Sequence, residues 1–330
     1  MIALGIEGTA HTLGFGIIRD DKILVNINDQ YIPETGGIHP REAVEHHTKY
    51  FKPLLTAALK QANLSLKDID LIAFSQGPGL GPCLRSVAVA ARSLSQLLSK
   101  ALVGVNHCLA HIEIGRKEIG NEIDPIVLYV SGGNTMVTGF EEGRYRIFGE
   151  TLDIPIGNLL DTFARHTGLQ HPGGPKIEKL AKKGNNFIKL PYVVKGMDLS
   201  YSGLLTAANN KFTEGADLND LCYSLQEVTY SMLSEITERA LAHTEKDSIL
   251  LTGGVAANKR LQEMLKSISD EHDVNFYVVS PKLAGDNGVM IAWTGILQYR
   301  YGMKLNLAES KIRAKWRLDE IEIPWITKRS

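Results

Sequence analysis

The stretch Asn106-His-Cys-Leu-Ala-His111 decides how this sequence is interpreted. The apolar run at 101–105 that precedes it is typical of a buried strand in a parallel sheet. We expect a helix to begin directly after that strand, with Asn106 as its N-cap. His107 and His111 are four positions apart, so on such a helix both imidazoles lie on one face, one turn apart.

Two imidazoles placed in this way suit a first-row metal ion if a third nitrogen or oxygen ligand comes from another segment. They could also be ordinary helix histidines, since His-x-x-x-His often occurs without a metal. Asp286, at the start of a helix predicted to run to Tyr301, is the best candidate for the third ligand. The alternative for Asp286 is a first-turn charge that interacts with the helix dipole. Because Asp286 is remote in sequence, we expect the site to close only when two lobes come together.

The composition is that of an ordinary soluble globular protein, with 44% apolar and 22% charged residues. A length of 330 residues favours two lobes. There is neither an apolar run of about eighteen residues nor a basic and apolar leader, so no membrane partner is expected. Three widely spaced cysteines favour reduced thiols in the cytoplasm.

The net charge of −1 predicts no strong general attraction to nucleic acid. If RNA is a partner, local patches or other subunits must supply the positive charge. A basic tail between Lys311 and Arg329 is expected to be a solvated surface.

Predicted strands alternate with predicted helices, which favours an α/β fold with a largely parallel sheet. The segment at 2–10 aligns with the segment at 127–135, and each is followed by a strand, a polar turn and another strand. This faint duplication predicts the two-lobed architecture of actin, sugar kinases and the Hsp70 ATPase (ASKHA), with two RNase H-like cores. We expect an N-terminal lobe over 1–124 and a C-terminal lobe over 125–330, with the final helix packing back on the first lobe.

Paired glycines recur at Gly132-Gly133, Gly173-Gly174 and Gly253-Gly254. One such pair usually marks a turn, whereas three, two of them at predicted strand ends, favour a cradle in which phosphates lie against backbone amides. Neither Gly-x-Gly-x-x-Gly nor a P-loop occurs. Asp161 and Glu178, near glycine-marked loops, could accept ribose hydroxyls, although either one alone is more often a solvated carboxylate.

Seven motifs, in order along nearly the whole chain, resemble those of one family, the universal tRNA threonylcarbamoyladenosine transferases. Its archaeal and eukaryotic members are the catalytic subunits of the KEOPS complex, and the family was once labelled a sialoglycoprotein endopeptidase. The first and fifth motifs resemble the archaeal and eukaryotic branch. The motifs are Ile6-Glu-Gly-Thr-Ala-His11, Gly36-Gly-Ile-His-Pro40, Ser75-Gln-Gly-Pro-Gly-Leu-Gly-Pro82, Val105-Asn-His-Cys-Leu-Ala-His111, Tyr129-Val-Ser-Gly-Gly-Asn134, His171-Pro-Gly-Gly-Pro175 and Gly253-Gly-Val-Ala-Ala-Asn258.

The resemblance implies metal ligands at His107, His111 and Asp286, with Tyr129 approaching the metal through its ring oxygen. Fe or Zn is the expected ion, and Mg is an alternative. Pro155 stands where a small residue is expected, which bears on the shape of the loop at 151–157. The resemblance also implies binding of threonylcarbamoyl-AMP or ATP by Tyr129, Val130, Ser131, Gly132, Gly133, Asp161, Gly174, Glu178 and Asn258.

The implied activity is transfer of the threonylcarbamoyl group from threonylcarbamoyl-AMP to N6 of adenosine 37, in tRNAs that read codons beginning with A. The implied partners are tRNA and the other KEOPS subunits: a dimerising subunit, a regulatory subunit and a small kinase-like subunit. The kinase-like subunit is expected as a separate chain, because no kinase signature occurs here. Glu7 and His11, in a loop expected to face the cleft, are candidates for the general base.

Three other functions fit parts of the pattern. A phosphoryl-transferring kinase of the same fold would need a catalytic Asp in the first loop, where this chain has Glu7-Gly-Thr-Ala-His11. A zinc metalloprotease would place a Glu directly after the first histidine, where this chain has Cys108. A non-catalytic RNA-binding scaffold is disfavoured by the near-neutral charge.

Overall fold

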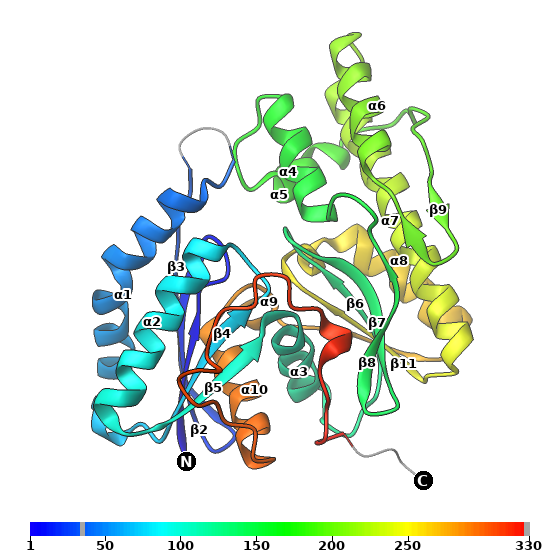
Figure 1. Cartoon of the computed structure of the whole chain (residues 1–330). Coiled ribbons are helices and arrows are strands. Elements are labelled where there is room, and N and C mark those ends of the chain that lie inside the picture. Colours follow the sequence, from blue (N-terminus) through cyan, green and yellow to red (C-terminus); the bar gives the residue numbers. More distant parts are fainter. Residues whose placement is uncertain (34–36, 327–330) are drawn as a thin grey trace. The chain divides into compact units, whose positions relative to one another are not determined.

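A computed structural model of the chain describes residues 1–33 and 37–326. The chain forms two compact units: unit 1 comprises Met1–Lys117 and Asp286–Ser330, and unit 2 comprises Glu118–Gly285. Each unit contains a five-stranded sheet (Figure 1). Gly36 of the second motif, and Lys328 and Arg329 of the basic tail, lie outside the described residues.

The sheet of unit 1 has the strand order β3-β2-β1-β4-β5. The first three strands form an antiparallel meander, and β4 and β5 then add in parallel to β1. Short polar turns connect β1 to β2 and β2 to β3, and such turns can join only antiparallel neighbours. The strands are β1 (Ile2–Glu7), β2 (Thr12–Arg19), β3 (Lys22–Gln30), β4 (Leu71–Gly77) and β5 (Ala101–Asn106).

The sheet of unit 2 repeats this plan in the order β8-β7-β6-β11-β12. Its first three strands are again an antiparallel meander, and β11 and β12 again add in parallel. The predicted duplicated α/β fold is therefore confirmed, although each sheet is mixed rather than largely parallel. The strands are β6 (Ile126–Val130), β7 (Thr135–Glu141), β8 (Arg144–Glu150), β11 (Ser248–Thr252) and β12 (Asn275–Val278).

Helices cover both faces of the first sheet. On one side α1 (Pro40–Ala62) packs beside α2 (Gly81–Leu98), and on the other α10 (Gly288–Arg300) contacts β1, β2 and β4 (Figure 1). The predicted helix at 84–98 begins earlier, at Gly81, because a proline is tolerated in the first helical turn. The fourth helix of this unit, α3 (His107–Ile119), follows β5 directly.

Glycines bring α10 into backbone contact with the sheet. A Cβ atom added at Gly16 would lie 2.1 Å from the amide nitrogen of Val289, and one added at Gly288 would lie 2.1 Å from that of Gly16. At Gly5 it would lie 2.1 Å from the carbonyl oxygen of Gly288. Real Cβ atoms do not approach so closely, so only glycine permits this packing.

The position of α10 also sets the limits of the two units. Everything from Asp286 onward belongs to unit 1, so unit 2 ends at Gly285 and not at the chain end. The first boundary falls inside α3, after Lys117, whereas the sequence suggested lobes of 1–124 and 125–330. The boundaries do not follow the order of the sequence, because the last part of the chain packs with the first part.

Unit 2 contains most of the remaining helices, and its predicted helical region at 200–243 is confirmed as α6 and α7. Two predictions there differ in detail. Gly173-Gly174, predicted as part of a turn, begins α5, and Asn258, predicted inside a helix, is the N-cap of α8. The helices are α4 (Ile156–His166), α5 (Gly173–Ala181), α6 (Ser202–Thr213), α7 (Leu218–Thr244), α8 (Lys259–Glu271) and α9 (Pro281–Ala284).

The loop that contains Pro155 has a defined shape. Pro155 is the N-cap residue of α4, with an extended backbone that proline readily adopts. Asp153 organises the loop, because its carboxylate accepts hydrogen bonds from the amides of Tyr201 (2.8 Å) and Ser202 (3.0 Å) and from the hydroxyl of Ser200 (2.6 Å). The unexpected proline is thus compatible with the start of the helix.

Each unit has its own apolar core, built around its sheet and helices. Among the described helices, none combines the length and the hydropathy needed to cross a bilayer.

We expect Gly16→Ala to lower the free energy of unfolding by about 3 kcal/mol, because the added methyl overlaps the backbone of α10. Gly203→Ala is the control: its Cβ meets open space in helix α6, so stability should stay the same or rise by up to about 1 kcal/mol. Urea unfolding measures both, and equal stability of the two variants would contradict the packing described for α10.

Asp153 should make stability depend on pH. Burial raises the pKa of this carboxyl, but the hydrogen bonds from Ser200, Ser202 and Tyr201 outweigh burial and lower it below its usual value of 3.8. A group whose pKa is lowered on folding stabilises the protein above its unfolded pKa, and the effect disappears as the pH falls through the folded pKa. We therefore expect Asp153→Asn to cost about 1 kcal/mol near neutral pH, after allowance for solvent screening. The difference between wild type and variant should shrink below about pH 4 in denaturant titrations, and a difference independent of pH would be inconsistent with this role.

Candidate functional site

The helix that carries the histidine pair begins as predicted. The side chain of Asn106 accepts a hydrogen bond from the amide of Leu109 at 3.1 Å and so caps α3. His107 and His111 lie one turn apart, with ring centroids 4.7 Å from each other. Both side chains are buried, so their nitrogens need partners within the protein.

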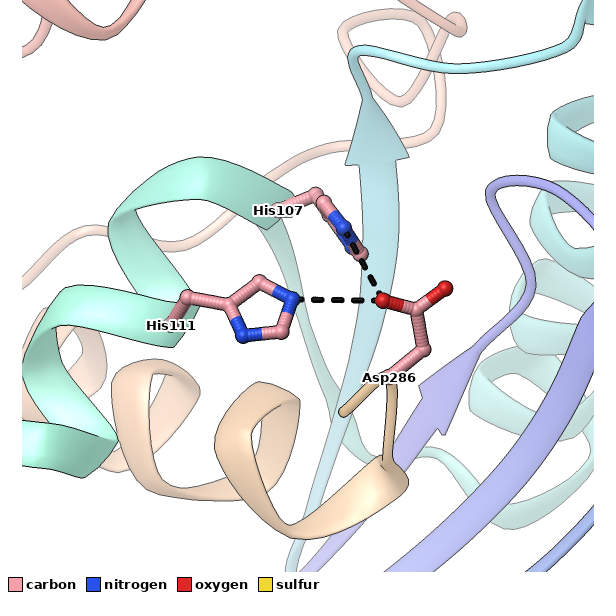
Figure 2. A group of neighbouring side chains, drawn as sticks. All are labelled: His107, His111 and Asp286. Atoms are coloured by element: carbon pink, nitrogen blue, oxygen red, sulfur yellow. Dashed lines mark hydrogen bonds and ion pairs between the residues drawn. The ribbon is translucent and has the colours of Figure 1, made fainter. Parts of the chain in front are cut away.

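Asp286 lies two residues before the start of α10, and its carboxylate contacts both histidines. Its Oδ1 atom lies 3.2 Å from Nε2 of His111 and 3.5 Å from Nε2 of His107, so one carboxylate oxygen faces both rings (Figure 2). The side chain of Asn287 accepts the amide of Met290 at 2.9 Å, which fixes the start of α10 and hence the position of Asp286.

The three side chains could hold a metal ion. Their ligand atoms all lie within 4.8 Å of one another. An ion about 2.0–2.1 Å from each nitrogen and oxygen brings neighbouring ligand atoms to about 3 Å apart, close to the separations found here. All three belong to unit 1, so the prediction that this cluster closes only when two lobes come together is wrong.

Glu7 contacts His107 on the side of the ring away from Asp286. Its side chain is fully buried, and Oε2 lies 3.1 Å from Nδ1 of His107, on the ring nitrogen opposite Asp286. Oε1 accepts hydrogen bonds from the amide (2.8 Å) and the hydroxyl (2.7 Å) of Thr9. A carboxylate on the far nitrogen of a metal-binding histidine fixes the orientation and tautomer of the ring. Glu7 therefore positions His107, a different role from that of a base in an open loop.

The charges around the cluster favour a cation. Burial lowers the pKa of His107, but the carboxylates of Glu7 and Asp286 outweigh burial and raise it to about 9. At His111 burial dominates and the pKa is lowered. Burial raises the pKa of Asp286, yet the charge of His107 and the hydrogen bond to His111 lower it overall. An ionised carboxylate is thus held beside two imidazole nitrogens, a set of donors suited to Fe, Zn or a related ion.

Cys108 and His11 lie close to the cluster. Burial, with the charges of Asp286 and Glu7, raises the pKa of the Cys108 thiol to about 12. His11 is partly exposed in the loop between β1 and β2, and its charge contributes to the lowered pKa of Asp286.

In unit 2 some of the predicted nucleotide positions follow the ends of two neighbouring parallel strands, β6 and β11. Tyr129 and Val130 end β6, and the loop after them is closed by Ser131, whose hydroxyl accepts the amide of Asn134 at 3.0 Å. At Gly253 the backbone has φ +97°, and a Cβ atom would lie 2.2 Å from the carbonyl oxygen of Val130. Only glycine allows the two loops to approach so closely.

The paired glycines of these loops leave space for a ligand. A Cβ atom at Gly132, Gly133 or Gly254 would meet no atom within 4 Å. The same loop is held from the other side by Gly157, whose amide donates to the carbonyl of Ser131 at 3.2 Å. The open backbone fits the predicted phosphate cradle.

The polar positions of unit 2 already make hydrogen bonds. Asp161 accepts the amide of Gly173 at 2.7 Å, beside Gly174, and its carboxylate raises the pKa of His171. Glu178 accepts the amide of Lys259 at 3.3 Å.

Asn258 caps α8 through Leu261 (3.2 Å) and donates to Gln226 at 3.1 Å. Each predicted carboxylate or amide therefore helps to fix a loop or a helix start.

Three supporting residues, Thr9, Gln226 and Trp316, were missed by sequence reasoning. Thr9 holds Glu7, Gln226 holds Asn258, and the amide of Asn106 donates to the carbonyl of Trp316 at 3.2 Å in addition to capping α3. The bonds of Gln226 and Trp316 join residues that are remote in sequence, for which a single sequence carries no signal, whereas Thr9 lies two residues from Glu7 in the same motif.

Comparison with known proteins shows the family. The sequence profile of tRNA N6-adenosine threonylcarbamoyltransferase matches residues 22–293. A relative of that description in Thermococcus sibiricus is 56% identical over 326 residues, covering 98% of this chain and 100% of the relative. In Methanothermobacter thermautotrophicus, a probable bifunctional tRNA threonylcarbamoyladenosine biosynthesis protein is 55% identical over 327 residues, covering 99% of this chain and 61% of that protein.

Two solved structures share the fold at low sequence identity. T. kodakarensis HypF is 18% identical with a TM-score of 0.62, and the match covers 92% of this chain and 48% of that one. A ROK hexokinase from Thermus thermophilus is 14% identical with a TM-score of 0.52, covering 91% of this chain and 100% of that one. The sugar kinase confirms the predicted ASKHA-type fold. The chain belongs to the family of tRNA N6-adenosine threonylcarbamoyltransferases and is a transferase that modifies tRNA.

Proposed function

We propose that the chain transfers the threonylcarbamoyl group from threonylcarbamoyl-AMP to N6 of adenosine 37, in tRNAs that read codons beginning with A. The observation that carries the proposal is the convergence of His107, His111 and Asp286 in a member of this family. In the reaction the adenosine amine attacks the carbamoyl carbonyl, a new C–N bond forms, the C–O bond to the phosphate breaks, AMP leaves and the amine loses a proton.

In this proposal His107, His111 and Asp286 hold one metal ion, Fe or Zn in preference to Mg, and Tyr129 is a further ligand through its ring oxygen. The ion would supply a positive charge that orients the adenylate or stabilises negative charge developing on the carbonyl oxygen. Glu7 and Thr9 hold His107 in place. The adenylate would lie against the backbone at 129–133, near the positions of Asp161, Gly174, Glu178 and Asn258.

The general base is assigned by exclusion among the predicted candidates. Both carboxylate oxygens of Glu7 are engaged, by Thr9 and by His107. His11 is partly exposed and close enough to Asp286 to influence its pKa. We assign proton removal from the amine to His11 and the positioning of His107 to Glu7.

We further propose that the chain is the catalytic subunit of a cytoplasmic KEOPS complex with separate kinase-like, dimerising and regulatory subunits. The fused relative in Methanothermobacter supports a link to a second activity, because about two fifths of that protein lies outside the match.

Removal of a metal ligand should abolish both metal binding and modification. We expect Asp286→Asn and His111→Ala to fold, to contain at least about tenfold less metal than the wild type, and to lose threonylcarbamoylation of tRNA. The measurements are elemental analysis of the purified proteins and mass spectrometry of tRNA nucleosides after reaction. His272→Ala is the control, because that residue pairs with Glu238 on the surface of unit 2.

Each readout tests a separate part of the assignment. Full metal content in both ligand variants would reject the three ligands. Full activity in metal-free wild-type protein would reject a catalytic role for the ion while leaving the ligands intact.

Truncation of Asn258 should affect both stability and nucleotide binding. Because Asn258 caps α8, Asn258→Ala should cost about 1 kcal/mol of stability. Asp217→Ala is the matched control: it removes the N-cap of α7 in the same unit, at a position with no predicted nucleotide contact. We expect calorimetric titration with ATP to show weaker binding only for the Asn258 variant. Equal ATP affinity of the two variants would mean that Asn258 has a structural role alone.

A further inference from the structure

The segment at 309–317, here called the C-terminal strap, crosses the carboxyl end of β4. The side-chain amide of Gln76 donates to the carbonyls of Glu309 (3.1 Å) and Lys311 (2.7 Å), and its backbone carbonyl accepts the amide of Arg313 at 2.8 Å. The amide of Gly79 then donates to the carbonyl of Ala314 at 3.2 Å. Figure 1 shows this part of the chain, in orange to red, passing by β4, β5 and α3. The strap is therefore held along its length.

A series of contacts connects the strap to the metal cluster. Asn106, the residue before His107, donates its side-chain amide to the carbonyl of Trp316 at 3.2 Å. Next to Gly79, the amide of Leu80 donates to the carbonyl of Thr9 at 2.7 Å, and the Thr9 hydroxyl lies 3.4 Å from Nδ1 of His107. The strap is thus connected to His107 by two short routes, one through its neighbour Asn106 and one through Leu80 and Thr9.

The strap is far more basic than the chain as a whole. It contains four cations and one anion, within a chain of net charge −1. Arg313 pairs with Glu320 at 2.9 Å and stacks on Trp316 at 4.1 Å, and Arg317 pairs with Asp319 at 3.1 Å. These pairs hold the strap but leave little net charge for a partner.

Lys311 and Lys315 differ from the two arginines. Both are exposed, and among residues 1–33 and 37–326 no carboxylate lies within salt-bridge distance of either ammonium group. Arg85, exposed in the first turns of α2 beside Gly81, is likewise without a carboxylate among the described residues. Two of these uncompensated cations therefore lie on the strap, and Arg85 lies on α2, which begins two residues after the strap's contact Gly79.

We propose that Lys311 and Lys315 of the strap, with Arg85, bind phosphate groups of the tRNA backbone beside the reacting nucleotide. The proposal rests on the proposed function, because it needs tRNA as the substrate. Exposed ammonium groups suit phosphates as point charges, whereas reading a base would require directed hydrogen bonds. The strap supplies the local positive patch that a chain of near-zero net charge needs to hold RNA.

The test compares Lys311→Glu/Lys315→Glu with Lys67→Glu/Lys195→Glu in the full chain. The control pair changes the net charge by the same amount at exposed lysines remote in sequence from the strap. Binding of unmodified tRNA is measured from about 50 to 200 mM salt. We expect the strap variant to bind at least about tenfold more weakly and to lose about one unit of salt slope per lysine, while the control matches the wild type.

Metal content and turnover separate this proposal from the proposed function. The strap variant should retain its metal, and at saturating tRNA its turnover should stay within about twofold of the wild type, with the loss confined to KM. Equal tRNA affinity and salt slope in the strap and control variants would overturn the phosphate contacts. Normal tRNA binding by a wild-type protein that transfers no threonylcarbamoyl group would instead reject the proposed function and leave the strap assignment standing.

Discussion

The backbone contact between α10 and the first sheet is the constraint on which the metal cluster depends. Glycines at positions 5, 16 and 288 let the helix approach to a distance that one methyl group would block. Asp286 precedes Gly288 by only two residues, so this contact also places its carboxylate. A carboxylate from the far end of the sequence is thereby held against two histidines, and functional sites in general require placement to within about 0.5 Å.

Both copies of the fold place candidate functional groups at the carboxyl ends of strands, but the strands and the chemistry differ. In unit 1 the ends of β1 and β5 carry Glu7 and His107, whose side chains face one another. In unit 2 the ends of β6 and β11 carry glycine pairs, which leave backbone amides open. Because the carboxyl ends of parallel strands meet at one edge, a single duplicated plan can offer side-chain ligands in one copy and a backbone cradle in the other.

The sequence was sufficient for most of the elements and for the three residues of the candidate metal site, but not for their supporting contacts. Strand–turn–strand repetition predicted the duplicated fold, and the four-residue spacing of His107 and His111 predicted their common face. Local patterns could not show that Asp286 shares a unit with them, since that depends on glycine packing between distant segments. Local patterns also predicted that Asn258 lies inside a helix, whereas its side chain caps α8 and donates a hydrogen bond to Gln226. Hydrogen bonds between residues remote in sequence produce no periodic pattern in the sequence, so they cannot be predicted from it.

The two nitrogens of His107 show how Glu7 is connected to the candidate metal site. Glu7 faces Nδ1 at 3.1 Å, and Asp286 faces Nε2 at 3.5 Å. If His107 held an ion through Nε2, the ring proton would lie on Nδ1 and be donated to Glu7. Such an ion would take the place of a proton, and the negative charge that raises the pKa of His107 would stabilise the metal instead. Glu7 thus acts through His107, which leaves the proton of the substrate amine to a more exposed group, His11 in our proposal.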